Sequence, residues 1–531
     1  MTMRILSVNT NAVLVELDDL ARTLALQASL RAEPIAGIEE LVPAARTLLI
    51  TFRPTAISAA ELARQVRQRP LEARELRADK RIEIPVRYTG EDLAEVAGLL
   101  GITPQELVRR HTGSDYTVAF TGFAPGFAYL SGGHPSLDVP RRTVPRTRIP
   151  AGAVGLAGSF SGVYPQASPG GWQIVGVTDA PMWDLARETP ALLQPGDTVR
   201  FVDVTASPRR LSVVVDTAPL SSNADVVPGG SALEVRATGL QALWQDRGRL
   251  GQAKQGVSAS GAMDQRALQA ANRLVGNASD VACVEIADGG FRFACRGDAV
   301  VAVTGADGPL ALTRADGAQW PLARYQAIAL ADGDTVALAE PRAGVRSYLS
   351  VRGGFAIAPV LGSCATDTLA RVGPPPLAVG DVLRVRAVTA GGVVGAPETP
   401  PADLPTLQEE VVLDIVLGPR TDWFAADAIE RLCSQPWQVT PQSSRVGIRL
   451  AGEQPLVRTR LSELPSEGTA RGSLQVPPSG QPVLFLADHP LTGGYPVIAS
   501  VAIHHLDRAG QIPVNARVRF QPVAALGPVE L

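Results

Sequence analysis

Cationic side chains gather in one short segment that could bind a negatively charged ligand. Four arginines, Arg141, Arg142, Arg146 and Arg148, fall within eight residues, among prolines that stiffen the backbone. A planar guanidinium group binds carboxylates and phosphates through two parallel hydrogen bonds. Arg141, Arg142 and Arg148 are therefore candidate substrate- or nucleotide-binding residues. A solvated cluster of surface charge is the alternative interpretation.

A second segment, residues 245–264, places cations, glycine and serine ahead of an expected helix. Lys254, one of two lysines in the chain, is a compact cation suited to a phosphate or a developing oxyanion. The N-terminus of the helix would present free N–H groups to the same loop. We predict Lys254 and Asp264 as catalytic residues and Arg249, Ser260 and Gly261 as binding residues. Helix capping alone would also explain Ser260 and Asp264.

Two histidine-bearing loops could supply proton transfer. His134 lies in a Gly-rich loop before a proline, where an exposed imidazole would titrate usefully. Asp488 directly precedes His489 and could orient that ring. We predict His134 and Asp488 as catalytic, although an incidental loop histidine and a plain hairpin fit the same residues. Glycine-rich turns could cradle an anion with backbone N–H groups, which adds as binding candidates Gly170, Gly171, Thr492, Gly493 and Gly494.

Two further patterns receive a structural interpretation. Residues 116–130 place aromatic side chains among Gly and Pro in a chain that is 5% aromatic. Gly122 and Gly126 permit tight backbone geometry there, so we favour an aromatic core joined by turns. His504 and His505 are expected on a strand, where successive side chains face opposite sides, and they receive no role.

Composition excludes several functions. The 49 basic and 52 acidic residues give a net charge of −3, which leaves no basic excess for a nucleic acid. Neither Lys80 nor Lys254 lies in a Walker loop, in a biotin-carrier setting or in a Ser–Ser–Lys amidase set. The four cysteines lack C-x-x-C spacing, so no metal site is predicted. With no signal-peptide core and no long apolar run, the sequence predicts a soluble, cytoplasmic protein without a membrane partner.

The elements expected to position these residues begin with a small α+β unit. Strands are predicted at 4–8, 12–17 and 48–52, and helices at 17–30 and 58–69. After residue 81, an alternating strand leads to two short helices. The second has Thr103 as N-cap, Pro104 at its first position and Glu106 completing a capping box, and it ends at Gly113.

From residue 116 onward, short strands separated by Gly and Pro predominate. A Gly-Asp turn before an alternating strand recurs at 195–201, 332–338 and 379–385, and a related strand lies at 515–520. This pattern suits the final strand of a small barrel and predicts several barrels in series. One clear helix is expected from Asp264 to Val275, followed by Gly276.

Longer strings of residues resemble a known family. Residues 122–130 (Gly-Phe-Ala-Pro-Gly-Phe-Ala-Tyr-Leu), 139–142, 148–152 and 168–172 resemble allophanate hydrolase subunit 1, also called the B-type accessory subunit of 5-oxoprolinase or the sporulation kinase inhibitor KipI. Residues 260–264 (Ser-Gly-Ala-Met-Asp), 271–277, 285, 347–349, 360–363 and 492–496 resemble subunit 2, which is the C-type accessory subunit or KipA. The chain is therefore identified as a fusion of the two subunits, and the pair also resembles the carboxyltransferase part of urea carboxylase.

The resemblance implies a mainly β fold of tandem cyclophilin-like β-barrels with a small α+β domain at the N-terminus. The expected divisions are the α+β domain at 1–80, a subunit 1-type barrel at 81–204, a linker at 205–231, a first subunit 2-type barrel at 232–390, a linker or long loop at 391–408 and a second subunit 2-type barrel at 409–531.

The resemblance also implies ATP-dependent opening of 5-oxoproline to glutamate, together with a LamB/YcsF-type subunit, ATP and Mg²⁺. The expected chemistry is phosphoryl transfer to the lactam oxygen followed by attack of water, with positive side chains balancing the phosphates. Motif position assigns this work to Arg141, Arg148, Lys254, Ser260, Asp264 and Asp488. Whether the chain forms a homo-oligomer is left open.

Two other functions remain alternatives to this interpretation. One is a carboxyltransferase-like protein that accepts carboxybiotin from another chain, since this chain carries no biotinyl-lysine of its own. The other is a KipI/KipA-like regulator of a sensor kinase, which the fusion of inhibitor and antagonist in one chain makes awkward. Allophanate hydrolysis itself is disfavoured because the amidase residues are absent.

Overall fold

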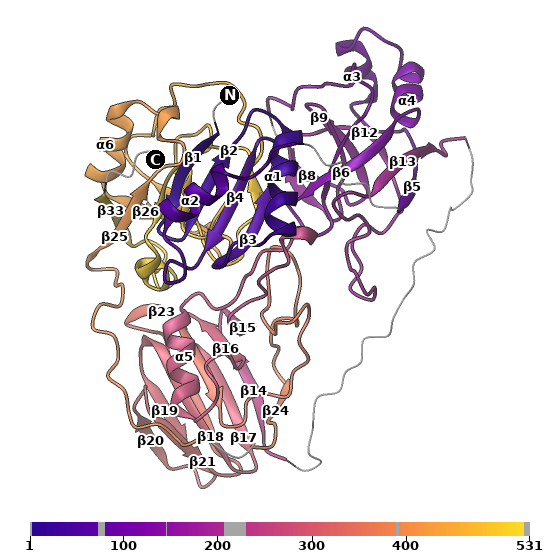
Figure 1. Ribbon diagram of the computed structural model, residues 1–531. Coiled ribbons are helices and arrows are strands. Elements are labelled where there is room, and N and C mark those ends of the chain that lie inside the picture. The colour runs from indigo at the N-terminus through magenta and orange to yellow at the C-terminus, as the bar shows by residue number, and fades with distance from the viewer. Residues whose placement is uncertain (1–2, 73–79, 145, 207–229, 389–391, 525–531) are drawn as a thin grey trace.

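The computed structural model describes residues 3–72, 80–144, 146–206, 230–388 and 392–524. One small α+β unit is followed by three larger β units (Figure 1). The predicted fold class, mainly β with tandem barrels and a small N-terminal α+β part, is confirmed. The predicted linker at 205–231 lies mostly outside the described residues, and residues 392–409 contain no helix or strand. No helix among the described residues is both long and apolar enough to cross a membrane.

The N-terminal unit is a four-stranded antiparallel sheet in the order β1-β2-β4-β3. Two helices, capped by Asp19 and Ser58, pack apolar side chains against one face of the sheet. The other face packs against apolar residues of the C-terminal half, so both faces are buried. The bounds are β1 Arg4–Asn9, β2 Ala12–Glu16, α1 Leu20–Ala32, β3 Ile38–Pro43, β4 Thr47–Phe52 and α2 Ala59–Arg67.

Strand β3 is not among the strands predicted from the sequence. Glu39 and Glu40 interrupt its apolar pattern, so the period-2 signal is absent.

The first large β unit is a curled seven-stranded sheet in the order β12-β9-β10-β7-β6-β13-β5. A bridge between Arg87 and Val177 joins its two ends, and the last strand pairs in parallel with the first. Thr103 caps the second of its helices, as predicted. The bounds are β5 Arg81–Val86, α3 Leu93–Leu99, α4 Pro104–Thr112, β6 Asp115–Thr121, β7 Ala128–Ser131, β8 Arg146–Ile149, β9 Ala153–Ala157, β10 Phe160–Val163, β11 Ser168–Gly170, β12 Gln173–Val177 and β13 Thr198–Asp203.

The middle β unit packs a six-stranded sheet against a five-stranded sheet around one apolar core. Helix α5 lies against strands β18 and β23 of the five-stranded sheet. The bounds are β14 Ala232–Thr238, β15 Gln241–Gln245, η1 Ala253–Gln255, α5 Gln265–Leu274, β16 Cys283–Ala287, β17 Phe291–Arg296, β18 Ala299–Asp307, β19 Leu310–Thr313, β20 Gln319–Leu322, β21 Ala327–Leu330, β22 Thr335–Leu338, β23 Ala343–Val351 and β24 Val382–Arg384.

The C-terminal unit is a closed barrel in the order β25-β32-β29-β30-β27-β26-β33, with Trp437 fully buried in its core. Its last strand pairs in parallel with its first, as in the first barrel. The bounds are β25 Glu410–Leu417, η2 Thr421–Trp423, α6 Ala426–Ser434, β26 Trp437–Val439, β27 Gly447–Ala451, β28 Glu467–Gly468, β29 Ser473–Gln475, β30 Val483–Phe485, β31 Thr492–Gly493, β32 Val497–Val501, η3 Ile503–His505, α7 Leu506–Ala509 and β33 Arg517–Ala524.

All four recurring segments contain strands, namely β13, β22, β24 and β33. Two of them, β13 and β33, are the parallel last strands of their barrels. Strand β22 instead lies inside the six-stranded sheet, between β19 and β17. The Gly-Asp turn therefore marks a strand start rather than the closing strand of every unit.

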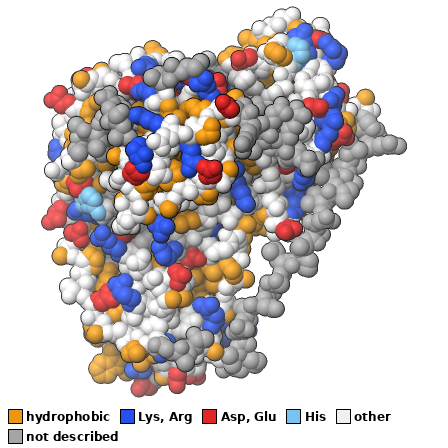
Figure 2. All heavy atoms as spheres, viewed as in Figure 1, with side chains coloured by type: hydrophobic (Ala, Val, Ile, Leu, Met, Phe, Trp, Pro, Cys, Tyr) orange, Lys and Arg blue, Asp and Glu red, His pale blue; other side chains and the backbone are white. Residues whose placement is uncertain are grey.

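Buried polar contacts fasten the N-terminal sheet to the C-terminal barrel, which lie side by side in Figure 1. The Arg420 guanidinium, 2% exposed, pairs with Glu467 and with Glu16 of β2, the latter at 3.0 Å. Asn9 donates from its side chain to the carbonyl of Val501 at 2.8 Å. On the face shown in Figure 2, basic and acidic side chains are interspersed over the surface.

Arg420→Met is expected to lower the free energy of unfolding by about 3–5 kcal/mol, because the buried carboxylate of Glu467 loses its paired arginine. Glu16, which is partly exposed, keeps its ion pair with Arg4. Denaturant titration measures the change. Arg64→Met removes an exposed Arg–Glu pair within one helix and serves as the matched control, expected to leave the unfolding midpoint unchanged. Equal effects of the two variants would contradict the structural role of Arg420.

Candidate functional site

A buried arginine lies at the centre of the contact between the middle unit and the C-terminal barrel. Arg445 is 2% exposed and pairs with Glu285 of β16. Its Nε and Nη2 atoms each donate to a different oxygen of Asp488 at 3.0 Å, and Nη2 also donates to the carbonyl of Gly261 at 2.7 Å. One guanidinium therefore fixes three segments that are far apart in the sequence.

The Asp488 carboxylate accepts further hydrogen bonds from the middle unit. Ser260 donates from Oγ at 2.6 Å, and Thr368 donates from its backbone N–H at 2.8 Å and from Oγ1 at 2.7 Å. Burial alone would raise the pKa of Asp488, but the charge and hydrogen bonds of Arg445 hold it below its usual value. Asp488 is therefore an ionised anchor, fully buried, with no surface open to a ligand.

Glu285 continues the network toward helix α5. Tyr348 donates its hydroxyl to Glu285 at 2.7 Å and accepts the backbone N–H of Asp264 at 2.8 Å. Asp264 caps α5 by accepting from Ala267 at 2.9 Å. Burial raises the pKa of Asp264 to about 6. We call Arg445, Glu285, Asp488, Ser260, Tyr348, Thr368 and Asp264 the Arg445 network.

Asp367 lies beside this network in a loop of the middle unit. It accepts from the backbone N–H groups of Leu369 and Ala370 at 3.0 and 2.7 Å and from Ser258 Oγ at 3.2 Å. Burial and the nearby Asp488 raise its pKa to about 6. Two carboxylates close together in a buried site cannot both ionise at low cost, so their protonation is linked.

A second group of predicted residues meets where the first barrel touches both parts of the C-terminal half. The loop 251–257, which carries Lys254, docks on the turn Gly122–Gly126. Gly126 donates to the carbonyl of Gln255 at 2.9 Å, and Thr121 Oγ1 donates to the carbonyl of Ala253 at 2.9 Å. From the N-terminal sheet, Glu40 accepts the N–H groups of Gly251 and Ala253 at 3.2 Å.

The turn 492–494 lies against the same part of the first barrel. A Cβ atom on Gly122 would come within 2.5 Å of Thr492 Oγ1, and one on Gly494 within 2.7 Å of an Arg141 guanidinium nitrogen. Arg141 reaches across to the C-terminal barrel, where it pairs with Glu463 at 2.9 Å and donates to Ser466 at 3.1 Å. We call the turn 122–126, the loop 251–257, the turn 492–494 and Arg141 the seam.

The seam and the Arg445 network are connected through shared loops. Asp488 and Thr492 lie in one loop, and Ser260 and Lys254 lie in another. The side chain of Gln166 in the first barrel donates to the carbonyl of Leu369 at 3.2 Å, next to Thr368. The network therefore positions the loops that form the seam.

The other arginines of the predicted cluster have different surroundings. Arg142 and Arg146 both bind the buried carboxylate of Asp92, at 2.9 and 2.6 Å, so their charge is largely satisfied within the protein. Arg148 is exposed, and the described residues provide no ion pair for it. Of the three predicted binding residues in this cluster, only Arg141 lies at the seam. The side chain of Arg148 is exposed to solvent, and Arg142 binds Asp92 within the first barrel.

Lys254 is exposed within the short 3₁₀ helix η1. No partner for its ammonium group is found in the part of the chain that the structure describes, which leaves it available to a ligand. Arg249 is different: it is buried and donates from Nη2 to the carbonyl of Ala365, while its Nε and Nη1 atoms have no hydrogen-bond partner among the described residues. Burial lowers the pKa of Arg249.

Several predicted residues have structural contacts that the sequence did not reveal. Gly170 pairs with Arg146 across β11 and β8, and a Cβ on it would lie 2.5 Å from the Tyr164 hydroxyl oxygen. Gly171 accepts from the backbone N–H of Arg142 at 2.8 Å. Gly493 pairs with Glu467 across β31 and β28. These glycines permit close backbone packing around the seam.

Three expectations need correction. Asp264, and not Ser260, caps helix α5, while Ser260 binds Asp488. Asp488 does not orient His489, whose Nδ1 instead bonds with the carbonyl of Leu486 at 3.0 Å. His134 lies beyond the end of β7 opposite the seam and hydrogen-bonds Ser136 at 2.9 Å, so the structure does not bring it together with the other candidates.

The aromatic segment is an aromatic core, as favoured from the sequence. Phe127, Tyr129 and Trp172 are buried and meet edge to face with ring centroids 5.1–5.6 Å apart. Phe123 at its edge adopts a left-handed backbone conformation with φ of 65°, which is unusual for an aromatic residue. The core thereby supports the turn that forms one side of the seam.

Sequence reasoning missed Arg445, Tyr348 and Thr368 as parts of the network, and Asp367 beside it. One signal was present: Glu285 is a charged residue inside the apolar strand Cys283–Ala287, which indicates a buried and paired carboxylate. Arg445 lies in a polar loop next to Ser443 and Ser444 and gives no comparable signal.

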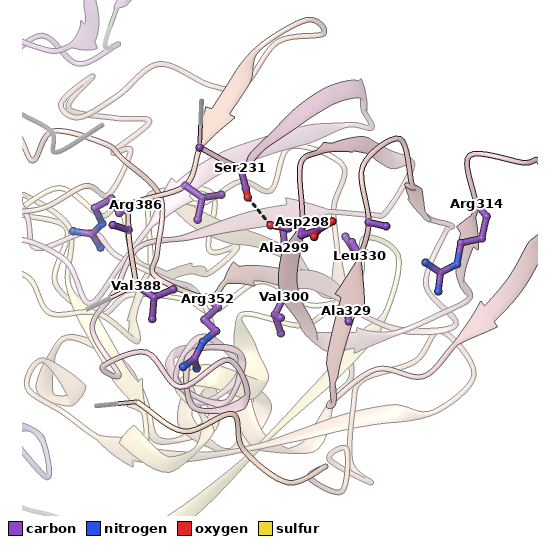
Figure 3. A pocket seen from close by; sticks show the side chains of 14 residues that line it. Ser231, Asp298, Ala299, Val300, Arg314, Ala329, Leu330, Arg352, Arg386 and Val388 are labelled. Atoms are coloured by element: carbon purple, nitrogen blue, oxygen red, sulfur yellow. Dashed lines mark hydrogen bonds between the residues drawn. The ribbon is translucent and has the colours of Figure 1, made fainter. Parts of the chain in front are cut away.

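A hollow of about 720 Å³ lies far from all these residues, at the outer end of the middle unit. Its floor includes Val300, Ala329 and Leu330 (Figure 3). The guanidinium groups of Arg314 and Arg352 in Figure 3 do not converge, and Asp334 and backbone carbonyls already bind them. Arg386 also lines the hollow and lies apart from both in Figure 3. The three arginines therefore form no shared cationic centre among the described residues.

Comparison with known proteins assigns both halves of the chain. The carboxyltransferase domain, subdomains A and B, matches residues 255–522, and subdomains C and D match residues 3–193. The chain belongs to the carboxyltransferase-domain family. Both the seam and the Arg445 network draw on residues from the matched segments.

Individual relatives divide between the two halves. The B-type subunit of 5-oxoprolinase from Escherichia coli O157:H7 is 41% identical over 170 residues, which are 31% of this chain and 78% of that protein. The C-type subunit of 5-oxoprolinase from Escherichia coli K12 is 34% identical over 293 residues, 54% of this chain and 90% of that protein. The solved structure of TTHA0988 is 34% identical, with a TM-score of 0.80, and covers 96% of this chain and 99% of that one. This family member is thus a fusion of B-like and C-like halves.

Asp367→Asn is expected to stabilise the protein above about pH 6 and to change little below about pH 4. Because the native pKa of Asp367 is raised to about 6, the native state holds this proton more tightly than the unfolded chain and loses stability as pH rises through the interval. The amide stays neutral, keeps the two backbone hydrogen bonds and can donate to Ser258.

Denaturant titrations of wild type and variant at pH 4 and pH 7 measure this effect. The gain at pH 7 is expected to reach up to about 3 kcal/mol, since one unit of pKa shift corresponds to about 1.4 kcal/mol. An equal gain in the free energy of unfolding at both pH values, or a loss at pH 7, would contradict a raised pKa of Asp367 caused by burial and by the nearby Asp488.

Proposed function

We propose that the chain is the fused B-like and C-like component of an ATP-dependent 5-oxoprolinase. It would act with a LamB/YcsF-type subunit to open 5-oxoproline to glutamate. The names of the relatives support this proposal, because the B-type and C-type subunits of 5-oxoprolinase match separate halves of one chain. Because both relatives are named as subunits of an enzyme, a further partner subunit for this chain is consistent with their names.

The observation that carries the proposal is the seam. Arg141 and the turn 122–126 come from the segment matched by subdomains C and D, and the turn 492–494 comes from the segment matched by subdomains A and B. Lys254 lies one residue before that second segment. Their meeting would form a site that needs both halves.

The residues of the seam fit a ligand that carries phosphates. Thr492 Oγ1 is buried with no hydrogen-bond partner in the described chain, in close contact with the backbone of Gly122. Arg141 and Lys254 supply positive charge. Mg²⁺ usually takes most of its ligands from phosphates, water and one or two carboxylates, and Glu463, half exposed beside Arg141, is the carboxylate available here.

Bound MgATP would supply the phosphoryl group that activates the lactam oxygen for attack by water. Lys254, exposed on a docked loop, would balance negative charge on the transferring phosphate or on the oxyanion. Arg141 would bind a phosphate or the substrate carboxylate through its guanidinium group while Glu463 and Ser466 hold it in place. The Arg445 network would keep both loops in register without touching the substrate.

Lys254→Met is expected to reduce turnover by at least about 100-fold, the usual cost of losing one preorganised charge contact. The assay combines the purified chain, the LamB/YcsF-type subunit, 5-oxoproline and MgATP, and measures glutamate and ADP. Lys80→Met is the matched control: Lys80 is the second lysine, is also exposed, and directly precedes β5, which strand β13 separates from β6 in the sheet. Neither change should alter the unfolding midpoint.

The outcomes separate the functions considered. Full activity of Lys254→Met would remove this residue from the site, and no glutamate or substrate-stimulated ADP from the wild type would overturn the proposal itself. Loss of label from a carboxylated biotin carrier would instead support a carboxyltransferase-like activity. Binding to a sensor kinase without either reaction would support a regulator.

A further inference from the structure

Three side chains with metal-binding atoms meet on the outside of the C-terminal barrel, away from the seam. Asp414 lies in the middle of β25, on the side of the strand that faces away from the barrel core. His504 and His505 lie in the short 3₁₀ helix η3 after β32. The strand expected here from the sequence would have separated the rings. The turn instead brings them together, with ring centroids 4.4 Å apart.

The three side chains already share contacts. His504 Nε2 lies 2.9 Å from Asp414 Oδ2, and His505 Nδ1 lies 3.8 Å from the same oxygen. One potential ligand atom from each of the three residues lies within 4.8 Å of the other two. Atoms bound to one metal ion at about 2.0–2.2 Å lie about 3–4 Å apart, so little movement separates this arrangement from a coordinated one.

The backbone around the cluster is fixed by hydrogen bonds. Ala502 donates to the carbonyl of Asp414 at 2.8 Å, and His505 donates to the carbonyl of Ala502 at 2.9 Å. The backbone N–H of Asp414 donates to His505 Nδ1 at 2.8 Å. The two bonds between backbone groups do not involve the imidazole rings and can persist when an ion binds, whereas the bond to His505 Nδ1 is exchanged. Strand and turn are thus held against each other before any ion arrives, which lowers the ordering cost of binding.

We propose that Asp414, His504 and His505 form a binding site for one divalent transition-metal ion of the zinc class. Imidazole and carboxylate together favour Zn²⁺, Ni²⁺ or Cu²⁺ over Mg²⁺ or Ca²⁺, which prefer oxygen ligands alone. Two histidines and one carboxylate leave a position open to water, as the partly exposed side chains permit. The site is separate from the Mg²⁺ expected with ATP at the seam.

Binding requires only local changes. The proton on His504 Nε2 that faces Asp414 moves to Nδ1 through solvent, so the metal replaces it between nitrogen and carboxylate without a net change in ring charge. The His505 ring turns from the N–H of Asp414 so that its nitrogen lone pair faces the ion, and water hydrogen-bonds the released N–H. Because strand β25 and helix η3 are then joined by the ion, binding stabilises the barrel.

The test uses the full chain, freed of metals by chelation, and titrates it with ZnCl₂ by calorimetry. One ion per chain is expected, together with a rise in the unfolding midpoint that MgCl₂ does not reproduce. His504→Ala and Asp414→Asn should each weaken Zn²⁺ binding by at least about 10–100-fold. His134→Ala, which removes an exposed histidine that bonds only Ser136 among described side chains, is the matched control and should bind Zn²⁺ as the wild type does.

A spectroscopic measurement on the wild-type protein tests the proposal even if a variant folds poorly. Co²⁺ in the wild-type site should give the visible absorption of a four- or five-coordinate ion with nitrogen and oxygen ligands, and His505→Ala should shift it. Zn²⁺ binding that persists unchanged in His504→Ala and Asp414→Asn, or an octahedral Co²⁺ spectrum identical to that of the aqueous ion, would overturn the proposal.

Discussion

The positions of the functional loops depend on one buried guanidinium. Arg445 is enclosed between the middle unit and the C-terminal barrel, and its charge is balanced by Glu285 from one and Asp488 from the other. An unpaired charge at such a depth would be strongly destabilising, so the two units cannot shift apart without a large energetic cost. This single constraint fixes the loop 486–494 against the loop 258–261.

The same constraint extends to the seam through the chain itself. Four residues after Asp488, Thr492 packs against Gly122 of the first barrel, and Gly494 packs against Arg141. A few residues before Ser260, the loop carrying Lys254 is held by the N-terminal sheet and by the turn 122–126. The Arg420 contacts then fasten the N-terminal sheet to the C-terminal barrel. The two halves of the fusion thus form one interface, and the residues that we propose for chemistry, Arg141 and Lys254, lie on it.

Much of the fold could be predicted from sequence because it is encoded locally. The N-cap at Thr103, the helix after Asp264 and the Gly-Asp strand starts all depend on residues a few positions apart. The return contact of the predicted capping box is replaced by ion pairs of Glu106 with Arg109 and Arg110. Pairings across hundreds of residues carry no such signal: nothing in the loop around Arg445 indicates that it meets Glu285, 160 positions away. The same reason explains why Asp488 was assigned to its neighbour His489 when its partners are Arg445, Ser260 and Thr368.

The histidines show that a sequence pattern alone determines neither the local backbone conformation nor the neighbours of a side chain. The alternation of apolar residues around His504 and His505 predicts a strand, yet a 3₁₀ turn directs both rings toward Asp414. His134 was selected for its exposed loop, which is present, but exposure alone says nothing about proximity to other functional groups. Residue type predicts what chemistry is available, whereas the tertiary contacts decide which groups can act together.

The central claim is that ligands bind at the seam and contact both halves at once. Hydrogen–deuterium exchange on the full chain with its LamB/YcsF-type partner, with and without MgATP and 5-oxoproline, tests it most directly. We expect slower exchange on ligand addition in residues 122–127, in the loop 251–257 and in residues 492–495 together. Protection confined to one half, or located instead around the hollow at Val300 and Leu330, would contradict the account.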